Sequence, residues 1–166
     1  MRPPALLVLS GLVLGAAACA TVEPAPEAAA AGPSPAPVEG YDWLLTLDDD
    51  MAHLAFGAPE SDDLQLGFNC RQGSSRVGMV TIAEGGNAPV IFLESGGETG
   101  QFAAEGEPSP LHDALILTAS AEVSEPVLQR FRRVGWVALW REGVRETYAP
   151  HPASSPNIER FFAFCG

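Results

Sequence analysis

The side chains best suited to bind a metal ion are concentrated between residues 48 and 63. Asp48, Asp49 and Asp50 precede His53, and a second acidic pair, Asp62-Asp63, follows. Carboxylate oxygens are the ligands of hard cations such as Ca²⁺, and imidazole binds transition metals. The spacing matches no cation-binding loop of known geometry, and acidic turns are common without a metal. We therefore predict neither a metal site nor a cofactor.

The serines and histidines form no recognisable catalytic pattern. The three histidines are His53, His112 and His151, and no Gly-x-Ser-x-Gly elbow accompanies them. The segment Ser95-Gly96-Gly97 is typical of a turn, and the glycines at 96, 97 and 100 lack the strand–helix setting of a phosphate loop. The sequence predicts no catalytic residue and hence a protein that is not an enzyme, with a hydrolase as the alternative.

Three cysteines are present, and two of them can pair. Cys19 lies in the N-terminal segment, which leaves Cys70 and Cys165. In an oxidising compartment two such cysteines are most simply a disulfide, here closing a loop of about 96 residues. The alternative is that Cys70 is a catalytic thiolate, but no histidine lies near it in the sequence.

Aromatic and arginine side chains alternate in the segment that follows residue 130. Trp136 and Trp140 share one face if residues 135–141 form a strand, with Val137 and Leu139 on the other. Such a strand is either central and buried or has an exposed aromatic face. In the second case the surface would bind a partner through five residues: Trp136, Trp140, Arg132, Arg133 and Arg141.

The charge distribution excludes some partners. The formal net charge is −12, no lysine is present, and ten acidic residues but no arginine lie between Glu23 and Asp63. A chain this acidic is a poor candidate for nucleic-acid binding, which needs clustered basic side chains. Five arginines fall between Arg130 and Arg145. They form either a solvated face or a patch that meets an anionic envelope component or an acidic protein.

The N-terminus has the order of an export signal. Arg2 precedes the apolar run of residues 5–14, which is too short to span a bilayer and is followed by small residues. The segment Ala16-Ala17-Ala18-Cys19 resembles a bacterial lipobox, although such motifs usually begin with Leu where Ala16 stands. The resemblance implies lipidation at Cys19, with palmitate among the acyl chains, and anchoring in the outer membrane because Ala20 is not acidic. The alternative is ordinary cleavage after Ala20, which releases a soluble protein.

The composition divides the chain into three parts. Residues 1–18 are the expected signal peptide, and residues 19–40 are the lipidated cysteine with a tether rich in Pro and Ala. At about 3.1 Å per residue in polyproline geometry, the tether extends roughly 65 Å. Residues 41–166 are expected to form one globular domain.

Short alternating segments indicate that this domain is mainly β. Residues 43–47 and 51–56 predict a hairpin around the three aspartates, with a short helix starting there as the alternative. Residues 64–70 alternate so that Cys70 faces the core, and a Glu142-Gly143 turn joins two later strands. We predict seven or eight short strands in a small sandwich or open barrel, with two short helices near 125–134 and 156–164.

The ends of this domain resemble a known family. Leu66-Gly67-Phe68-Asn69-Cys70 and the final Cys165-Gly166, together with Cys19, resemble the small lipoproteins of the periplasm that inhibit lysozyme. The resemblance implies a β-rich domain whose disulfide joins an early strand to the C-terminus. That family's inhibitory Ser-Ala-Ser-Gly loop has no close match, and residues 94–97 are a poor substitute.

These patterns predict an exported, lipid-anchored protein of the bacterial envelope, facing the periplasm. Its role is expected to be non-enzymatic binding of a protein or an anionic envelope component, with the membrane contacted through the lipid. The alternative functions are lysozyme inhibition and, less in keeping with the residues, hydrolysis.

The first testable prediction concerns the mature N-terminus. We expect mass spectrometry of the protein from bacterial membranes to find Cys19 as the first residue, carrying a diacylglyceryl group, because the lipobox-like segment ends there. A Cys19→Ser variant should lose both the lipid and the membrane fraction. A free N-terminal Thr21 in the native protein would contradict lipidation.

Overall fold

The computed structural model describes residues 34–83, 89–110 and 113–166. The predicted signal peptide, Cys19 and most of the tether lie outside the described residues, as does His112. The described end of the tether, residues 34–40, contains neither helix nor strand. Neither helix in these ranges is both long and apolar enough to cross a membrane.

The described residues form ten strands and two helices, which confirms the mainly-β fold class. In chain order the elements are β1 (Asp42–Asp48), β2 (Met51–Gly57), β3 (Leu64–Arg71), β4 (Arg76–Ala83), β5 (Val90–Ser95), β6 (Glu98–Ala103), β7 (Glu105–Pro108), β8 (Leu115–Glu122), α1 (Pro126–Val134), β9 (Val137–Arg141), β10 (Val144–Tyr148) and α2 (Ser155–Cys165).

The strands form two antiparallel sheets that do not close into a barrel. The first sheet has the order β1-β2-β3-β4-β8-β7, and the second has the order β10-β9-β5-β6. The chain passes from one sheet to the other at Ala104, between β6 and β7, so the sheets adjoin at this edge. Of the predicted alternatives, the architecture is therefore the sandwich.

The strand count is the part of the prediction that the structure corrects. The described residues contain ten strands where seven or eight were predicted. Strand β7 has the sequence Glu-Gly-Glu-Pro and is exposed throughout, so it carries no apolar alternation that would indicate a strand. It forms because its backbone pairs with β8 at the edge of the first sheet.

The predicted hairpin around the aspartates is confirmed. Asp48 pairs with Met51 at the ends of β1 and β2, so Asp49 and Asp50 form the turn. Asp49 has a φ of 26°, a conformation that Asp tolerates better than most residues. The alternative helix at this position does not form.

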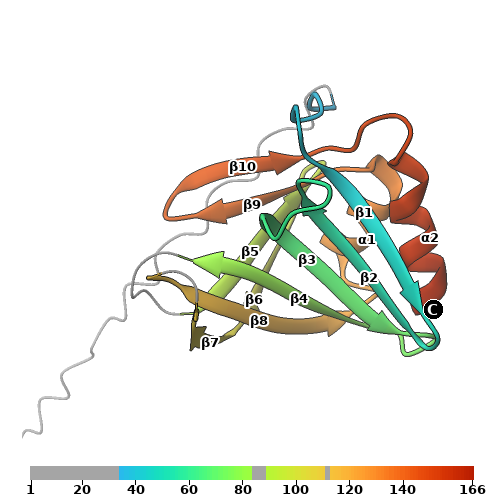
Figure 1. Cartoon of the computed structure of the whole chain (residues 1–166). Coiled ribbons are helices and arrows are strands. Elements are labelled where there is room, and N and C mark those ends of the chain that lie inside the picture. The colour runs from blue at the N-terminus through green and yellow to red at the C-terminus, as the bar shows by residue number, and fades with distance from the viewer. Residues whose placement is uncertain (1–33, 84–88, 111–112) are drawn as a thin grey trace, which may run out of the picture.

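Both helices lie at one end of the sandwich, on the right in Figure 1. Helix α1 packs on β5 and β6, and α2 packs on β1, β2 and β3. Pro126 at the start of α1 and Gly135 after its end set its limits, since Pro suits the first turn and Gly135 adopts the left-handed conformation, with φ 79°. The predicted limits of both helices agree with the structure to within one residue at each end.

Aromatic side chains fill the space between the sheets and the helices. Trp43 and Phe68 come from the first sheet and Phe131 comes from α1, with ring centroids 5.1 Å apart for Trp43–Phe131 and 5.6 Å for Phe68–Phe131. From α2, Phe162 lies 5.8 Å from Phe131, edge to face. Burying such rings supplies a large share of the hydrophobic stabilisation of a small domain.

A disulfide fixes the end of α2 to the first sheet. Cys70 on β3 and Cys165 on α2 form the bond, and their Cα atoms are 5.6 Å apart. The backbone N–H groups of Gly73 and Ser75 donate to the carbonyl oxygens of Phe164 and Cys165 at 3.0 and 2.9 Å. The β3–β4 turn thus satisfies carbonyls at the end of α2 that have no partner within the helix.

We expect the double variant Cys70→Ser/Cys165→Ser to lose about 4–5 kcal/mol of unfolding free energy, because the bond closes a long loop in the unfolded chain. Urea unfolding of the non-reduced protein measures this loss. Cys19→Ser is the matched control, since it replaces a cysteine outside the loop and should leave the unfolding free energy unchanged. Equal stability of the two variants would contradict the prediction.

Candidate functional site

A cleft of about 1190 Å³ lies between the two sheets, at the end opposite the helices. It is bordered by the first residues of β3, β5 and β8, by the last residues of β4, and by the β9–β10 hairpin, which projects from the body at the left of Figure 1. The helices pack at the other ends of β3 and β5, so nothing from α1 or α2 enters this space.

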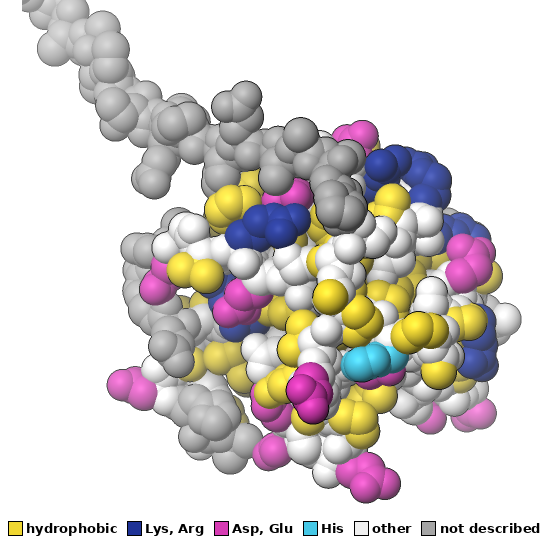
Figure 2. All heavy atoms as spheres, turned by 90° about the horizontal axis from the view of Figure 1, so that it is seen from above, with side chains coloured by type: hydrophobic (Ala, Val, Ile, Leu, Met, Phe, Trp, Pro, Cys, Tyr) yellow, Lys and Arg dark blue, Asp and Glu magenta, His cyan; other side chains and the backbone are white. Residues whose placement is uncertain are grey.

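Apolar and acidic side chains line the cleft together. The apolar part includes Leu64, Val90, Leu115, Leu117, Leu139 and Val144. Three of these are unusually exposed for their type, with relative exposures of 44% for Leu64, 41% for Val90 and 60% for Val144. In the view from above Figure 1, hydrophobic side chains are scattered over the upper surface of the molecule among acidic and basic ones (Figure 2). Such a lining suits a ligand with apolar groups.

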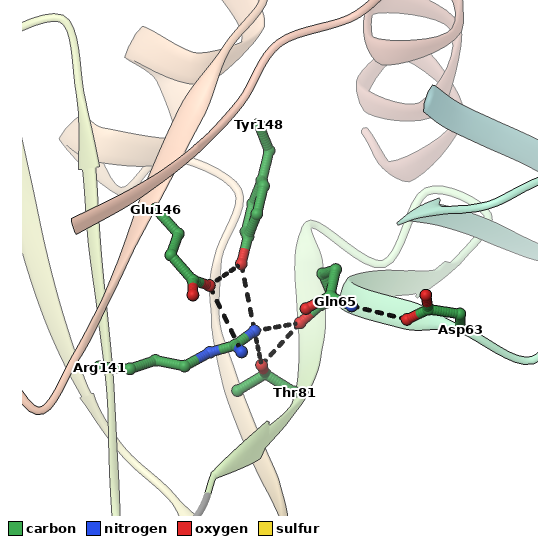
Figure 3. Close-up of polar contacts among 6 residues, drawn as sticks. All are labelled: Asp63, Gln65, Thr81, Arg141, Glu146 and Tyr148. Atoms are coloured by element: carbon green, nitrogen blue, oxygen red, sulfur yellow. Dashed lines mark hydrogen bonds and ion pairs between the residues drawn. The ribbon is translucent and has the colours of Figure 1, made fainter. Parts of the chain in front are cut away.

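Arg141 is the only basic residue among the described residues of the cleft lining, and it connects the two sheets (Figure 3). The alternation of β9 directs Val137, Leu139 and Arg141 toward the first sheet, with the first two buried and Arg141 at the end of the strand. The Nη2 atom of Arg141 donates to the carbonyl oxygen of Gln65 at 2.9 Å and to Thr81 Oγ1 at 3.3 Å. Thr81 Oγ1 in turn donates to the same carbonyl at 2.7 Å.

Strand β10 supplies the other partners of Arg141. Its Nη2 donates to Tyr148 Oη at 3.1 Å, and its Nη1 lies 3.4 Å from Glu146 Oε2. Tyr148 Oη donates to the same carboxylate oxygen at 2.7 Å. Burial and the hydrogen bond to Glu146 raise the pKa of Tyr148 well above its usual value, so this phenol stays neutral at neutral pH. The network is structural: it holds one charged group between the sheets through Nη1 and Nη2, while the buried Nε of Arg141 has no hydrogen-bond partner among the described residues.

The cleft carries excess negative charge. In the described part of the chain its lining contains five carboxylates, those of Asp62, Asp63, Asp113, Glu142 and Glu146, against the single guanidinium of Arg141. Glu146 pairs with Arg141, whereas Asp62, Asp113 and Glu142 are exposed and form no ion pair with another described residue. This field attracts cations and repels anions.

The five residues of the predicted partner surface do not share one face. Arg132 and Arg133 lie on α1, where Arg132 donates to Glu159 of α2 at 2.8 Å and Arg133 is exposed. Trp136 is buried with Ala138 and Ala149 on the outer side of the second sheet. Trp140 is half-buried and borders the cleft, and only Arg141 points into the space between the sheets. The structure thus brings Trp140 and Arg141 to the cleft and separates the other three from it.

A buried carboxylate on the outer side of the second sheet was not anticipated. Glu94 is 1% exposed. Arg145 donates to both of its oxygens at 2.8 Å, and Trp140 Nε1 donates to Oε2 at 3.0 Å. These bonds, that of Arg145 foremost, lower the pKa of Glu94 against the opposing effect of burial. The sequence signal that could have found it is a Glu within the apolar run of β5.

The segment with the nearest likeness to an inhibitory loop is not presented to solvent. Glu94 and Ser95 end β5 and are buried, and Ser95 Oγ donates to the carbonyl oxygen of Trp136 at 2.7 Å. Gly96 and Gly97 form the turn to β6, both with positive φ. Only the glycine turn of this segment reaches the surface.

The remaining chemical candidates are dispersed. In the described ranges no three His, Cys, Asp or Glu side chains form a metal-binding group. His53 is exposed on β2, and Asp50 pairs with Arg71 at 2.8 Å. His151 Nε2 lies 3.2 Å from the carbonyl oxygen of Val38, while Ser154 Oγ bonds to Asp42 and not to the imidazole. His112 lies outside the described residues.

Comparison of the chain with models of protein families, with curated proteins and with solved structures finds no match in any of the three.

We expect Glu94→Gln to lower the unfolding free energy by about 2 kcal/mol at neutral pH, because Arg145 loses its charged acceptor. The lowered pKa of Glu94 means that its contribution is present above the unfolded value of about 4.3 and is lost as the pH falls through the folded value. The difference between native and variant proteins should therefore narrow in acid, which urea unfolding at a series of pH values measures.

The matched control for this prediction is Glu122→Gln. It removes an exposed partner of Arg76 and should cost about 0.5 kcal/mol or less. If both substitutions cost the same, Glu94 is not the buried anchor that its contacts indicate.

Proposed function

We propose that this chain is an exported, lipid-anchored envelope protein whose domain binds a cationic partner in the cleft between its sheets. The observation that carries the binding proposal is the cleft itself, which combines exposed apolar side chains with three exposed carboxylates that form no ion pair with another described residue. The export proposal is supported by the N-terminal segment and by the Pro-rich tether that follows it.

The charge of the cleft favours one class of partner over another. An anionic envelope component was expected from the arginines between residues 130 and 145, but three of these arginines are in ion pairs. A lipid phosphate would have to approach Asp62, Asp113 and Glu142, each unpaired with other described residues and exposed. Repulsion of the phosphate by these carboxylates outweighs its attraction to Arg141, whose guanidinium is already engaged with Glu146. A basic segment of a protein, with apolar side chains beside its charges, is the better fit.

Binding rather than catalysis is proposed because the cleft offers surface and charge rather than a reacting pair. Its titratable groups are carboxylates, one guanidinium committed to four contacts and, behind them, a phenol that stays protonated. Neither described histidine borders it. A site of this kind discriminates by shape and charge.

The test uses a fluorescently labelled heptapeptide, Thr-Lys-Thr-Val-Thr-Lys-Thr. The control is the same peptide with both Lys residues replaced by Glu. We expect fluorescence anisotropy to show binding of the Lys peptide that weakens as salt is added, and no binding of the Glu peptide. The double variant Asp62→Asn/Asp113→Asn should weaken binding about fivefold, since each charge contributes about 0.5 kcal/mol.

The control variant is Asp48→Asn/Asp49→Asn, which changes the net charge equally but lies in the β1–β2 turn, outside the cleft lining. It should bind the Lys peptide as the native protein does. Equal weakening in the two double variants would show a general charge effect and overturn the assignment of the cleft.

A further inference from the structure

We propose that the partner binds as an added strand along the free edge of β10, with alternate side chains directed into the cleft. This inference rests on the proposed function and specifies the form in which the cationic segment is held. Its basis is the position of β10, which is at once the edge of the second sheet and a wall of the cleft.

The backbone of β10 has hydrogen-bonding groups that its own sheet does not use. Residues 142 and 143 form a two-residue turn, both with positive φ, so the closing pair Arg141–Val144 exchanges hydrogen bonds and the next pair does not. The N–H and C=O groups of Arg145 and Thr147 therefore point away from β9. No backbone hydrogen bond joins them to another segment of the described chain.

The side chains of β10 divide between the cleft and the outer side of the sheet. Val144 and Glu146 line the cleft, and they offer one exposed apolar group and one carboxylate in alternation. Across the cleft, Asp62 and Asp63 precede β3 and add negative charge on the facing sheet. An added strand would therefore place apolar and basic side chains on its cleft side.

The outer side of the same edge has different chemistry. Arg145 is engaged there with Glu94 and lies over the ring of Trp136, 5.6 Å from its centroid, and Thr147 accepts a hydrogen bond from it at 2.8 Å. A basic side chain on this face would meet a guanidinium. The occupant is thus an extended segment with Lys or Arg and aliphatic residues at alternate positions and neutral polar residues between them.

Strand addition also accounts for the exposure of Val144, the most exposed large apolar residue in the described chain at 60%. An open edge with an exposed aliphatic side chain is an aggregation risk that proteins usually block with Lys, Pro or a bulge. This edge has neither Lys, Pro nor a bulge, and its two charged side chains, Arg145 and Glu146, are held in ion pairs within the domain. A partner strand would cover it, supplying main-chain bonds for affinity and alternate pockets for specificity.

Backbone methylation of the Lys heptapeptide is the direct test. In a strand, N–H groups of alternate residues face the same neighbour, so one set faces β10 and the other faces solvent. Two peptides are compared, N-methylated at the odd or at the even positions. We expect one to lose at least tenfold in affinity and the other to bind as the parent does.

A pair of substitutions on the protein gives an independent measurement. Thr147→Pro removes the N–H group that points away from β9, so the hydrogen bonds between β9 and β10 stay intact. An edge strand tolerates proline at such a position. Thr147→Ala removes the hydroxyl and keeps the N–H. We expect at least a tenfold loss of peptide affinity for Thr147→Pro relative to Thr147→Ala. In the native protein, peptide should slow amide hydrogen exchange at Arg145 and Thr147.

The outcomes separate this inference from the proposed function. Strand addition is wrong, and cleft binding stands, under two conditions that accompany binding of the Lys peptide in the cleft. The two methylated peptides bind with equal affinity, and the Arg145 and Thr147 amides stay unprotected from hydrogen exchange. If the Lys peptide does not bind, or binds without regard to Asp62 and Asp113, the proposed function fails. The methylated peptides decide the matter even if Thr147→Pro does not fold.

Discussion

The space between the two sheets is the constraint on which the rest of this structure depends. The chain crosses between the sheets at Ala104, and the gap between the sheets away from that crossing must be filled or left to solvent. At one end Phe131, Phe161 and Phe162 of the two helices fill it against Trp43 and Phe68. At the other end no helix is available, and Arg141 bridges the sheets instead. The gap between the sheets is thus filled by aromatic side chains at one end, whereas at the other end it is bridged by Arg141 and remains open as the cleft.

The polar bridge explains why the second end stays open. An apolar side chain at position 141 would favour closure of the sheets onto it, because burial of its surface would be the only interaction offered there. A guanidinium needs acceptors in fixed directions, and it finds them in the Gln65 carbonyl, Thr81, Tyr148 and Glu146. Once these are engaged, the sheets are held at the distance that the arginine sets. The carboxylates around it remain hydrated and give the cleft its charge.

The sequence carried enough information for the local structure and much less for the contacts between sheets. Alternation in residues 64–70 located β3 and turned Cys70 inward, and Pro126 with Gly135 set the limits of α1. These features depend on neighbours within a few residues. The Glu94–Arg145 pair joins positions 51 residues apart, and the Arg141–Gln65 bond joins positions 76 apart. Their partners are chosen by sheet order, which periodicity does not encode. Trp136 illustrates this limit. It lies just before β9, and its ring packs on Ala138 and Ala149 instead of forming part of an exposed aromatic face.

The two ends of the sandwich also differ in how firmly they are held, and this bears on where binding occurs. The helix end combines the Cys70–Cys165 bond, the aromatic cluster and the backbone bonds from Gly73 and Ser75 to α2. The cleft end has one partly exposed arginine network and the projecting β9–β10 hairpin, whose outer strand has neighbours on one side only. Local opening is easiest where buried apolar contacts are few and backbone groups face water. An added strand would give β10 the second neighbour that every central strand of the sheet already has, so the partner would stabilise an edge strand that pairs with β9 alone among the described strands. Binding and completion of the second sheet would then be the same event.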